Sequence, residues 1–190
     1  MSDEKSIEEF ADAAEFDEWL AANHADHPGV WLRIAKKGAP TTSVSYDEAL
    51  DVAIAWGWID GQKKPLDAHY WLQAFTSRRP RSAWSKRNVD KAAAMIEAGT
   101  MHPSGLAQVE AAKADGRWER AYAGPAGATE SPEFRAALDA NPAASTFYAT
   151  LGSANRFAFY YRIQSAKKEE TRARRIEAFV AMLERGETFH

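Results

Sequence analysis

The sequence contains no cysteine, which excludes disulfides, thiolate nucleophiles and cysteine-ligated zinc. It also has no large excess of charge of one sign. The formal net charge is −3 at neutral pH, so any binding to nucleic acid or to an anionic membrane has to use a local patch. No apolar run reaches the roughly 18 residues of a membrane span, and the N-terminus MSDEKSIEEF is too acidic for a signal peptide. These absences lead us to expect a cytoplasmic protein.

The motifs that usually accompany catalysis are also missing. The chain has no G-x-S-x-G nucleophile elbow, no P-loop, no dinucleotide-binding glycine pattern and no H-E-x-x-H motif. His24 and His27 lie where the first helix is expected to end, but a metal site built on them lacks a third ligand. The sequence therefore predicts no catalytic residue, no metal and no cofactor, and it leaves open whether the protein is an enzyme.

Aromatic residues, by contrast, are abundant. They make up 12% of the 190 residues, which predicts a core with several large rings. Residues 30–36 and 69–76 alternate side chains between two faces as strands do, and Trp58 opens a third such segment. Asp60-Gly61 is a turn dipeptide, and a second turn follows at 65–67. We therefore predict a small antiparallel sheet of about three or four strands.

Helical patterns surround this sheet and occupy the rest of the chain. Ser45 and Glu48 form a capping box before one helix. Residues 123–131, which are small and contain glycine and proline, are typical of a linker, and only helical patterns follow them. The predicted fold class is α+β, with a sheet-and-helix domain over 1–122 and a helical C-terminal region over 131–190. Because about 60 residues bury little core alone, we expect this region to pack on the first domain.

The densest basic run lies in a loop that leads into a predicted helix. No acidic residue interrupts it between positions 78 and 87. Arginine forks match phosphate and carboxylate oxygens with two hydrogen bonds, and the free N–H groups at a helix start favour the same charge. We therefore predict a site for an anionic small molecule or phosphate group. Its expected ligand-binding residues are Arg78, Arg79, Arg81, Trp84, Ser85, Arg87 and Asp60.

Other interpretations of these residues stay open. The arginines can form a solvated surface or pair internally with Asp60 or Asp67. The two aspartates can also act as general acid and base on an anionic metabolite, which makes the protein a small-molecule enzyme. Trp84 can stack on bases, so nucleic acid is a further alternative, although we do not favour it.

The last two predicted helices carry six further cations. Glu169 and Glu170 interleave with them, which indicates a solvated and partly paired face. These cations are Arg162, Lys167, Lys168, Arg172, Arg174 and Arg175.

Five segments, in this order, resemble one known family. They are WLRIAKKG, SYDEALDVAIAWGWIDGQ, FTSRRPRSAWSKRN, GLAQVEAAKADGRW and SANRFAFYYRIQSAKKEETRARRIE. They look like the YdeI/OmpD-associated family, also called bacteriocin-protection proteins, over a range from about Phe10 to His190. Members of this family are linked to resistance against bacteriocins and cationic antimicrobial peptides, and one is linked to an outer-membrane porin. The resemblance therefore implies a non-enzymatic stress-response and bacteriocin-protection protein, and it supplies no catalytic residue.

Overall fold

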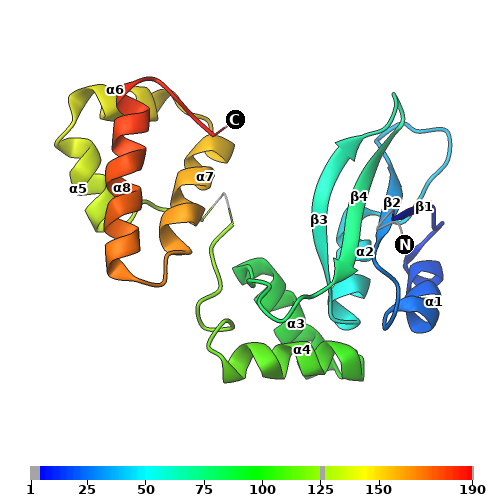
Figure 1. The fold of residues 1–190 in the computed structure, drawn as a ribbon. Helices are drawn as coiled ribbons and strands as arrows, with labels where there is room; N and C mark the ends of the chain where they lie inside the picture. The colour runs from blue at the N-terminus through cyan, green and yellow to red at the C-terminus, as the bar shows by residue number, and fades with distance from the viewer. Residues whose placement is uncertain (1–4, 125–126, 190) are drawn as a thin grey trace. The chain divides into compact units, whose positions relative to one another are not determined.

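The computed structural model describes residues 5–124 and 127–189 (Figure 1). Its chain divides into two compact units. Unit 1 comprises Met1–Trp84 and Asn88–Ala121, and unit 2 comprises Ser85–Arg87 and Tyr122–His190. Among the described residues the predicted α+β class is confirmed, because strands and helices mix in the first part and helices alone form the C-terminal part.

Unit 1 is built on a four-stranded sheet with the strand order β1-β2-β4-β3. Its strands are β1 (Ser6–Glu8), β2 (Val30–Ala35), β3 (Trp58–Pro65) and β4 (Tyr70–Ser77). β2 and β3 each pair antiparallel with β4, as the alternation predicts, whereas β1 pairs parallel with β2. The sheet is therefore mixed rather than purely antiparallel. The reason is the helix α1 (Ala13–Asn23), which crosses over between β1 and β2 and lets both strands run in the same direction.

One predicted turn is wrong. Asp60-Gly61 lies inside β3, where the register with β4 shifts between Asp60 and Lys63, as in a β-bulge. The chain reverses later, after Pro65, at the second predicted turn. There Asp67 Oδ1 accepts hydrogen bonds from the backbone N–H groups of His69 at 2.7 Å and Tyr70 at 2.8 Å. A glycine within a strand often marks a bulge, so the dipeptide alone does not distinguish a bulge from a turn.

One face of the sheet forms the core of unit 1 together with α1 and the helix α2 (Tyr46–Ala55). Phe16 of α1 and Phe75 of β4 are fully buried, and their ring centroids lie 5.7 Å apart. The predicted capping box of Ser45 and Glu48 is present at the start of α2. It fixes where α2 begins and so how its apolar face meets the sheet.

The opposite face of the sheet is covered in part by its own long side chains. The Arg33 guanidinium lies 3.8 Å from the centroid of the Tyr70 ring, and the Lys64 ammonium lies 4.3 Å from that of Trp31. Leu72, which pairs with Arg33 in register, is only 7% exposed. Charged side chains thus bury apolar ones here by laying their stems and cationic groups across the rings.

Two further helices, α3 (Lys86–Ala98) and α4 (Pro103–Ala114), follow the sheet. α4 packs against the end of α2 so closely that a Cβ on Gly105 would come within 2.1 Å of the Ala55 carbonyl oxygen. The rings of Trp56 and His102 stack beside this contact with centroids 3.6 Å apart, and Trp56 Nε1 donates to Asp17 Oδ1 at 2.8 Å. This contact joins α1, α2 and α4.

Unit 2 is helical, with its own core. Its helices are α5 (Pro132–Asp139), α6 (Pro142–Thr150), α7 (Ser153–Gln164) and α8 (Glu169–Glu184). α8 contacts each of the other three, and the aromatic rings of Phe134, Tyr148 and Phe159 pack beneath it. None of the helices in the described part of the chain is long and apolar enough to cross a membrane.

Candidate functional site

The residues predicted to bind an anion are divided between the two units. Asp60 and the loop from Arg78 to Trp84 belong to unit 1, while Ser85 and Arg87 belong to unit 2. The unit 1 loop itself contains two kinds of arginine. Arg78 is buried, and the other two are exposed on the surface.

Arg78 is packed into the interior of unit 1. It is 4% exposed, its Cζ atom lies 3.6 Å from the centroid of the Trp84 ring, and its Nη1 donates to the Ala83 carbonyl at 3.2 Å. Trp118 meets the Trp84 ring edge-on, with centroids 5.2 Å apart. Trp84 is therefore a core residue, 1% exposed, that holds Arg78 by a cation–π contact instead of offering a free face to a base.

Arg79 and Arg81 are both exposed, on a loop with a defined backbone. The Arg79 N–H donates to Ser82 Oγ at 3.0 Å, and the Ser82 N–H donates back to the Arg79 carbonyl at 2.9 Å. Arg117 Nη1 donates to the Ser82 carbonyl at 3.0 Å, which ties the loop to the segment after α4. Pro80 between the two arginines further restricts the backbone. The loop thus presents two guanidinium groups from a constrained turn.

The carboxylates that could pair with these arginines are engaged elsewhere. Asp60 accepts a hydrogen bond from the Tyr46 hydroxyl at 2.9 Å. The pKa of Asp67 is held below its usual range, first by the hydrogen bond from the His69 backbone and then by that from Tyr70. Within residues 5–124 and 127–189, no ion pair joins either aspartate to Arg79 or Arg81.

The same two aspartates are not brought together as an acid–base pair. Asp60 pairs with Phe75 in the sheet, and Pro65 at the end of β3 pairs with Trp71. Pro65 comes five residues after Asp60, a distance of roughly 15 Å along β3, and Asp67 lies beyond that end. One carboxylate supports the packing of α2 and the other a turn, so the arrangement gives no observation in favour of catalysis by the pair.

The unit 2 part of the basic run is fastened by its backbone. Ser85 forms a parallel bridge with Tyr122, and the Lys86 N–H donates to the Tyr122 carbonyl at 2.8 Å. The N–H groups at the start of α3 were predicted to bind an anion. One of them, the N–H of Lys86, therefore already has a backbone acceptor. Arg87, in the first turn of α3, is exposed.

Two neighbouring hollows in unit 2 were not predicted from the sequence. The first has a volume of about 440 Å³ and the second about 350 Å³. Thr129, Glu130 and Tyr160 line both of them. The first is also lined by Ala128, Tyr148, Leu151, Ser153, Arg156 and Phe157, and the second by Ser131, Pro132, Phe134, Ile163, Gln164 and Arg172.

A carboxylate and a phenol meet at the edge of the first hollow. Burial acts to raise the pKa of Glu130, but hydrogen bonds from its own backbone, from Tyr148 and from Arg135 outweigh burial and leave that pKa below its usual range. Burial raises the pKa of Tyr148, and the bond to Glu130 raises it further. At neutral pH Tyr148 is therefore a neutral phenol that donates to an ionised carboxylate. This bond joins the segment before α5 to α6.

The arginines that line the hollows are held by helix ends. Arg156 Nη2 donates to the Ala149 carbonyl at 2.7 Å, and Arg172 Nη2 donates to the Ala166 carbonyl at 3.4 Å. The Nε atoms of both are buried and have no hydrogen-bond partner within the described residues. The sequence offers no signal for these hollows, because Glu130 lies in the stretch predicted as a linker. Residues 125 and 126 of that stretch lie outside the described residues.

The histidines considered as metal ligands pack against tryptophans. His27 meets Trp19 edge-on, with ring centroids 4.8 Å apart, and the His24 ring lies 4.6 Å from that of Trp56. In the described part of the chain there is no group of three or more His, Asp or Glu side chains placed to hold a metal ion.

Comparisons with known proteins match the two parts of the chain to different families. Residues 8–108 match the family described as a domain of unknown function (DUF8412), and residues 128–186 match the family described as bacteriocin-protection, YdeI or OmpD-associated. No curated protein and no solved structure matches the chain. The predicted resemblance to the bacteriocin-protection family is confirmed over 128–186. It was expected from about Phe10, but the first four of its five motifs lie outside that match.

Proposed function

The chain belongs to the DUF8412 family, whose match covers residues 8–108, and we propose that it is a non-enzymatic stress-protection protein. The proposal rests on residues 128–186, which match bacteriocin-protection proteins. In this proposal it protects against bacteriocins or related antimicrobial peptides by binding an anionic ligand at the loop of unit 1. We place it in the cytoplasm, which suits a chain that contains no cysteine.

The single observation that carries the proposed ligand site is the pair of exposed arginines on a constrained loop. Arg79 and Arg81 flank one proline, and neither has an ion-pair partner within the described residues. A guanidinium fork binds phosphate or carboxylate oxygens through two hydrogen bonds. Because the loop backbone is already ordered, a ligand here costs less conformational entropy than at a flexible chain.

The third arginine has a different role in this proposal. Arg78 is clamped between Trp84 and the Ala83 carbonyl, so it positions the loop and adds positive charge behind it without contacting the ligand. Ligand contacts are then assigned to Arg79 and Arg81, with the Ser82 hydroxyl beside them. Replacing Arg78 by alanine would disturb folding, so it is unsuitable as a test of binding.

Thermal unfolding with and without phosphate, sulfate and nucleotides tests the site. At a ligand concentration about 100-fold above Kd, wild type should gain about 2.7 kcal/mol, which raises Tm by roughly 10 °C. Arg79→Ala/Arg81→Ala should lose this rise. Arg79→Lys/Arg81→Lys should not restore it fully, because a point charge lacks the two-point fork.

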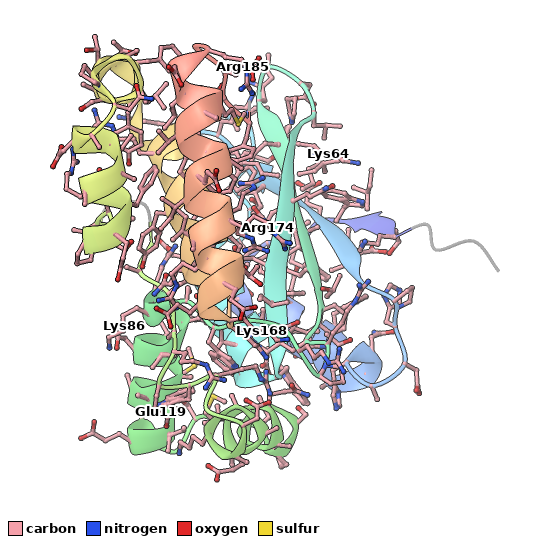
Figure 2. All side chains as sticks on the ribbon, turned by 60° about the vertical axis from the view of Figure 1, so that its left-hand side comes forward. Lys64, Lys86, Glu119, Lys168, Arg174 and Arg185 are labelled. Carbon is pink, nitrogen blue, oxygen red and sulfur yellow. The ribbon has the colours of Figure 1, made fainter. Side chains whose placement is uncertain are left out.

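The matched control is Arg174→Ala, which removes an exposed arginine of α8 (Figure 2) and should keep the ligand-dependent rise. If no anion raises the Tm of wild type, Arg79 and Arg81 are solvated surface residues and the proposed site is wrong. If Arg174→Ala loses the rise as well, the anion acts through general charge and not through this loop.

A further inference from the structure

One end of the unit 1 sheet brings together two loops that are distant in the sequence. Ala35, the last residue of β2, pairs with Tyr70, the first residue of β4. Pro65, the last residue of β3, pairs with Trp71 beside it. The loop after β2 and the turn between β3 and β4 therefore emerge at the same end of the sheet, as Figure 1 shows.

This end is basic although the whole chain is acidic. Segments 35–45 and 61–70 contain four lysines and one aspartate, a formal charge of +3, in a chain whose net charge is −3. The remaining residues therefore carry −6. Such a local basic patch attracts a negative surface even though the net charge of the chain is negative. The four lysines are Lys36, Lys37, Lys63 and Lys64, and we refer to them as the tip lysines.

Carboxylates do not neutralise the tip lysines. No ion pair within the described residues includes any of them. Lys63 Nζ lies 4.2 Å from the ring centroid of Trp71, and Lys36 Nζ donates to the backbone carbonyl of Asp67 at 2.6 Å. The one carboxylate of segments 35–45 and 61–70, that of Asp67, accepts from backbone N–H groups of the turn. The positive charge is thus available to a partner.

An apolar residue stands among these charges. Leu66, in the turn between β3 and β4, is 43% exposed, and among the large hydrophobic side chains of the described residues only Ile7, at 55%, is more exposed. Beside it a groove of about 740 Å³ is lined by Ala35, Lys36, Lys37, Lys63, Pro65 and Trp71. Three of its six lining residues are lysines, and the others supply apolar walls.

We propose that this basic end of the sheet docks on an anionic lipid surface. The tip lysines pair with phosphate and carboxylate groups of the lipid heads, and Leu66 enters the interface between headgroups and acyl chains. Lysine pairs with such surfaces in this way, and an apolar side chain adds burial. Single-stranded nucleic acid fits less well, because the lysines lie over the tryptophan rings that bases would stack on, and Leu66 would have no part in its binding.

Co-sedimentation with lipid vesicles tests the proposal. Wild type should bind vesicles that contain phosphatidylserine, should not bind pure phosphatidylcholine vesicles, and should bind less as salt increases. Each lysine near such a surface contributes about a fivefold gain in partitioning, so replacing all four tip lysines by glutamine should weaken binding by more than about 100-fold. Leu66→Ser should weaken it by about fivefold.

Two matched controls separate this surface from the other basic regions. Arg79→Ala/Arg81→Ala removes the proposed ligand site and Lys167→Gln/Lys168→Gln removes exposed lysines of unit 2. Both should bind phosphatidylserine vesicles like wild type. All variants replace exposed side chains. The four-lysine variant also removes the cation–π contacts of Lys63 and Lys64, so its Tm should fall somewhat, while the Tm values of the other variants should stay close to that of wild type.

Three outcomes would overturn the proposal. The first is that wild type does not bind phosphatidylserine vesicles even at low salt. The second is that both control variants lose binding as fully as the tip-lysine variant does. The third is that wild type binds single-stranded DNA more tightly than vesicles, through the tip lysines and with no effect of Leu66→Ser, which would make nucleic acid the partner.

Discussion

Several arginines of α7 and α8 in unit 2 donate to backbone carbonyls, whereas Arg79 and Arg81 of unit 1 extend from a loop into solvent. Arg156 Nη2 donates to the Ala149 carbonyl in the last turn of α6 at 2.7 Å, and Arg175 Nη1 donates to the Arg162 carbonyl in the last turn of α7. Every helix leaves carbonyl groups without partners at its C-terminal end, and cations near that end are favourable. Arginines beside these ends therefore have a structural role, as the buried Arg78 has in unit 1, whereas the exposed Arg79 and Arg81 form no ion pair within the described residues.

This difference corrects one expectation from the sequence. The cations of the last two helices were expected to form a solvated, partly paired face. Lys167, Lys168 and Arg174 are exposed as expected, but Arg162 and Arg175 have carbonyl partners. The number of arginines in a segment is thus a poor guide to ligand binding, and the backbone groups around each one decide its role.

The largest predicted effect concerns whether the two units unfold separately. Phe159 of α7 is fully buried among Phe134, Tyr148 and Phe179, and Phe159→Ala should cost unit 2 about 3–5 kcal/mol. All seven tryptophans lie between Trp19 and Trp118, so tryptophan fluorescence reports unit 1 alone. We expect far-UV circular dichroism to show an earlier transition in denaturant while the fluorescence midpoint stays in place.

The reciprocal variant is Phe75→Ala, which removes a buried ring of unit 1 and should move the fluorescence midpoint. If Phe159→Ala moves both signals together, the units unfold as one. That result would favour the expectation from the sequence that the C-terminal region over 131–190 packs on the domain over 1–122, which stays a prediction.

A prediction of intermediate size compares an arginine that donates to a helix-end carbonyl with an arginine that is exposed. Arg156 donates to the Ala149 carbonyl at 2.7 Å and lies 5.3 Å from the centroid of the Tyr148 ring. Arg156→Ala should therefore destabilise unit 2 by about 1–3 kcal/mol, as for a charged hydrogen bond. Arg81→Ala should change stability by less than about 0.5 kcal/mol, since it removes an exposed side chain. Chemical denaturation of both variants measures how much unfolding free energy each one loses. Equal losses would mean that the arginines of the two units do not differ in their structural role.

The smallest effect is a pH dependence of unit 2. Because the folded-state pKa of Glu130 lies below its ordinary value of 4.5, the ionised carboxylate stabilises the fold above that pH, and this stability is lost as pH falls through the folded-state pKa. Glu130→Gln should cost about 1 kcal/mol or less at neutral pH, since the side chain is partly solvated. The difference in unfolding free energy between wild type and Glu130→Gln should shrink below pH 4.5.

Circular dichroism over a pH series measures this effect. Glu177→Gln, at an exposed position of α8, is the matched control and should show no such convergence. The difference in stability between wild type and Glu130→Gln could instead stay constant through the acid range. That result would mean that the charge of Glu130 does not support the fold.

Much of the secondary structure follows from signals that lie within a few residues. Ser45 accepts from the Glu48 N–H, which confirms the predicted capping box, and Ser131 and Asn141 cap α5 and α6 in the same way by accepting from the Phe134 and Ala144 N–H groups. In each case the capping side chain and its partner are three residues apart. The antiparallel pairing of β3 with β4 agrees with the predicted sheet, although the turn at Asp60-Gly61 does not connect them.

Local hydrogen bonds and side-chain periodicity were thus sufficient to predict the start of α2, the main strands and the α+β class. Only the folded structure shows that Trp84 and Arg78 lie in the interior, that Glu130 meets Tyr148, and that tip lysines from two loops share one end of the sheet. These contacts join residues that are distant in the chain. Their distances depend on how the strands pair and the helices pack, which no local spacing encodes.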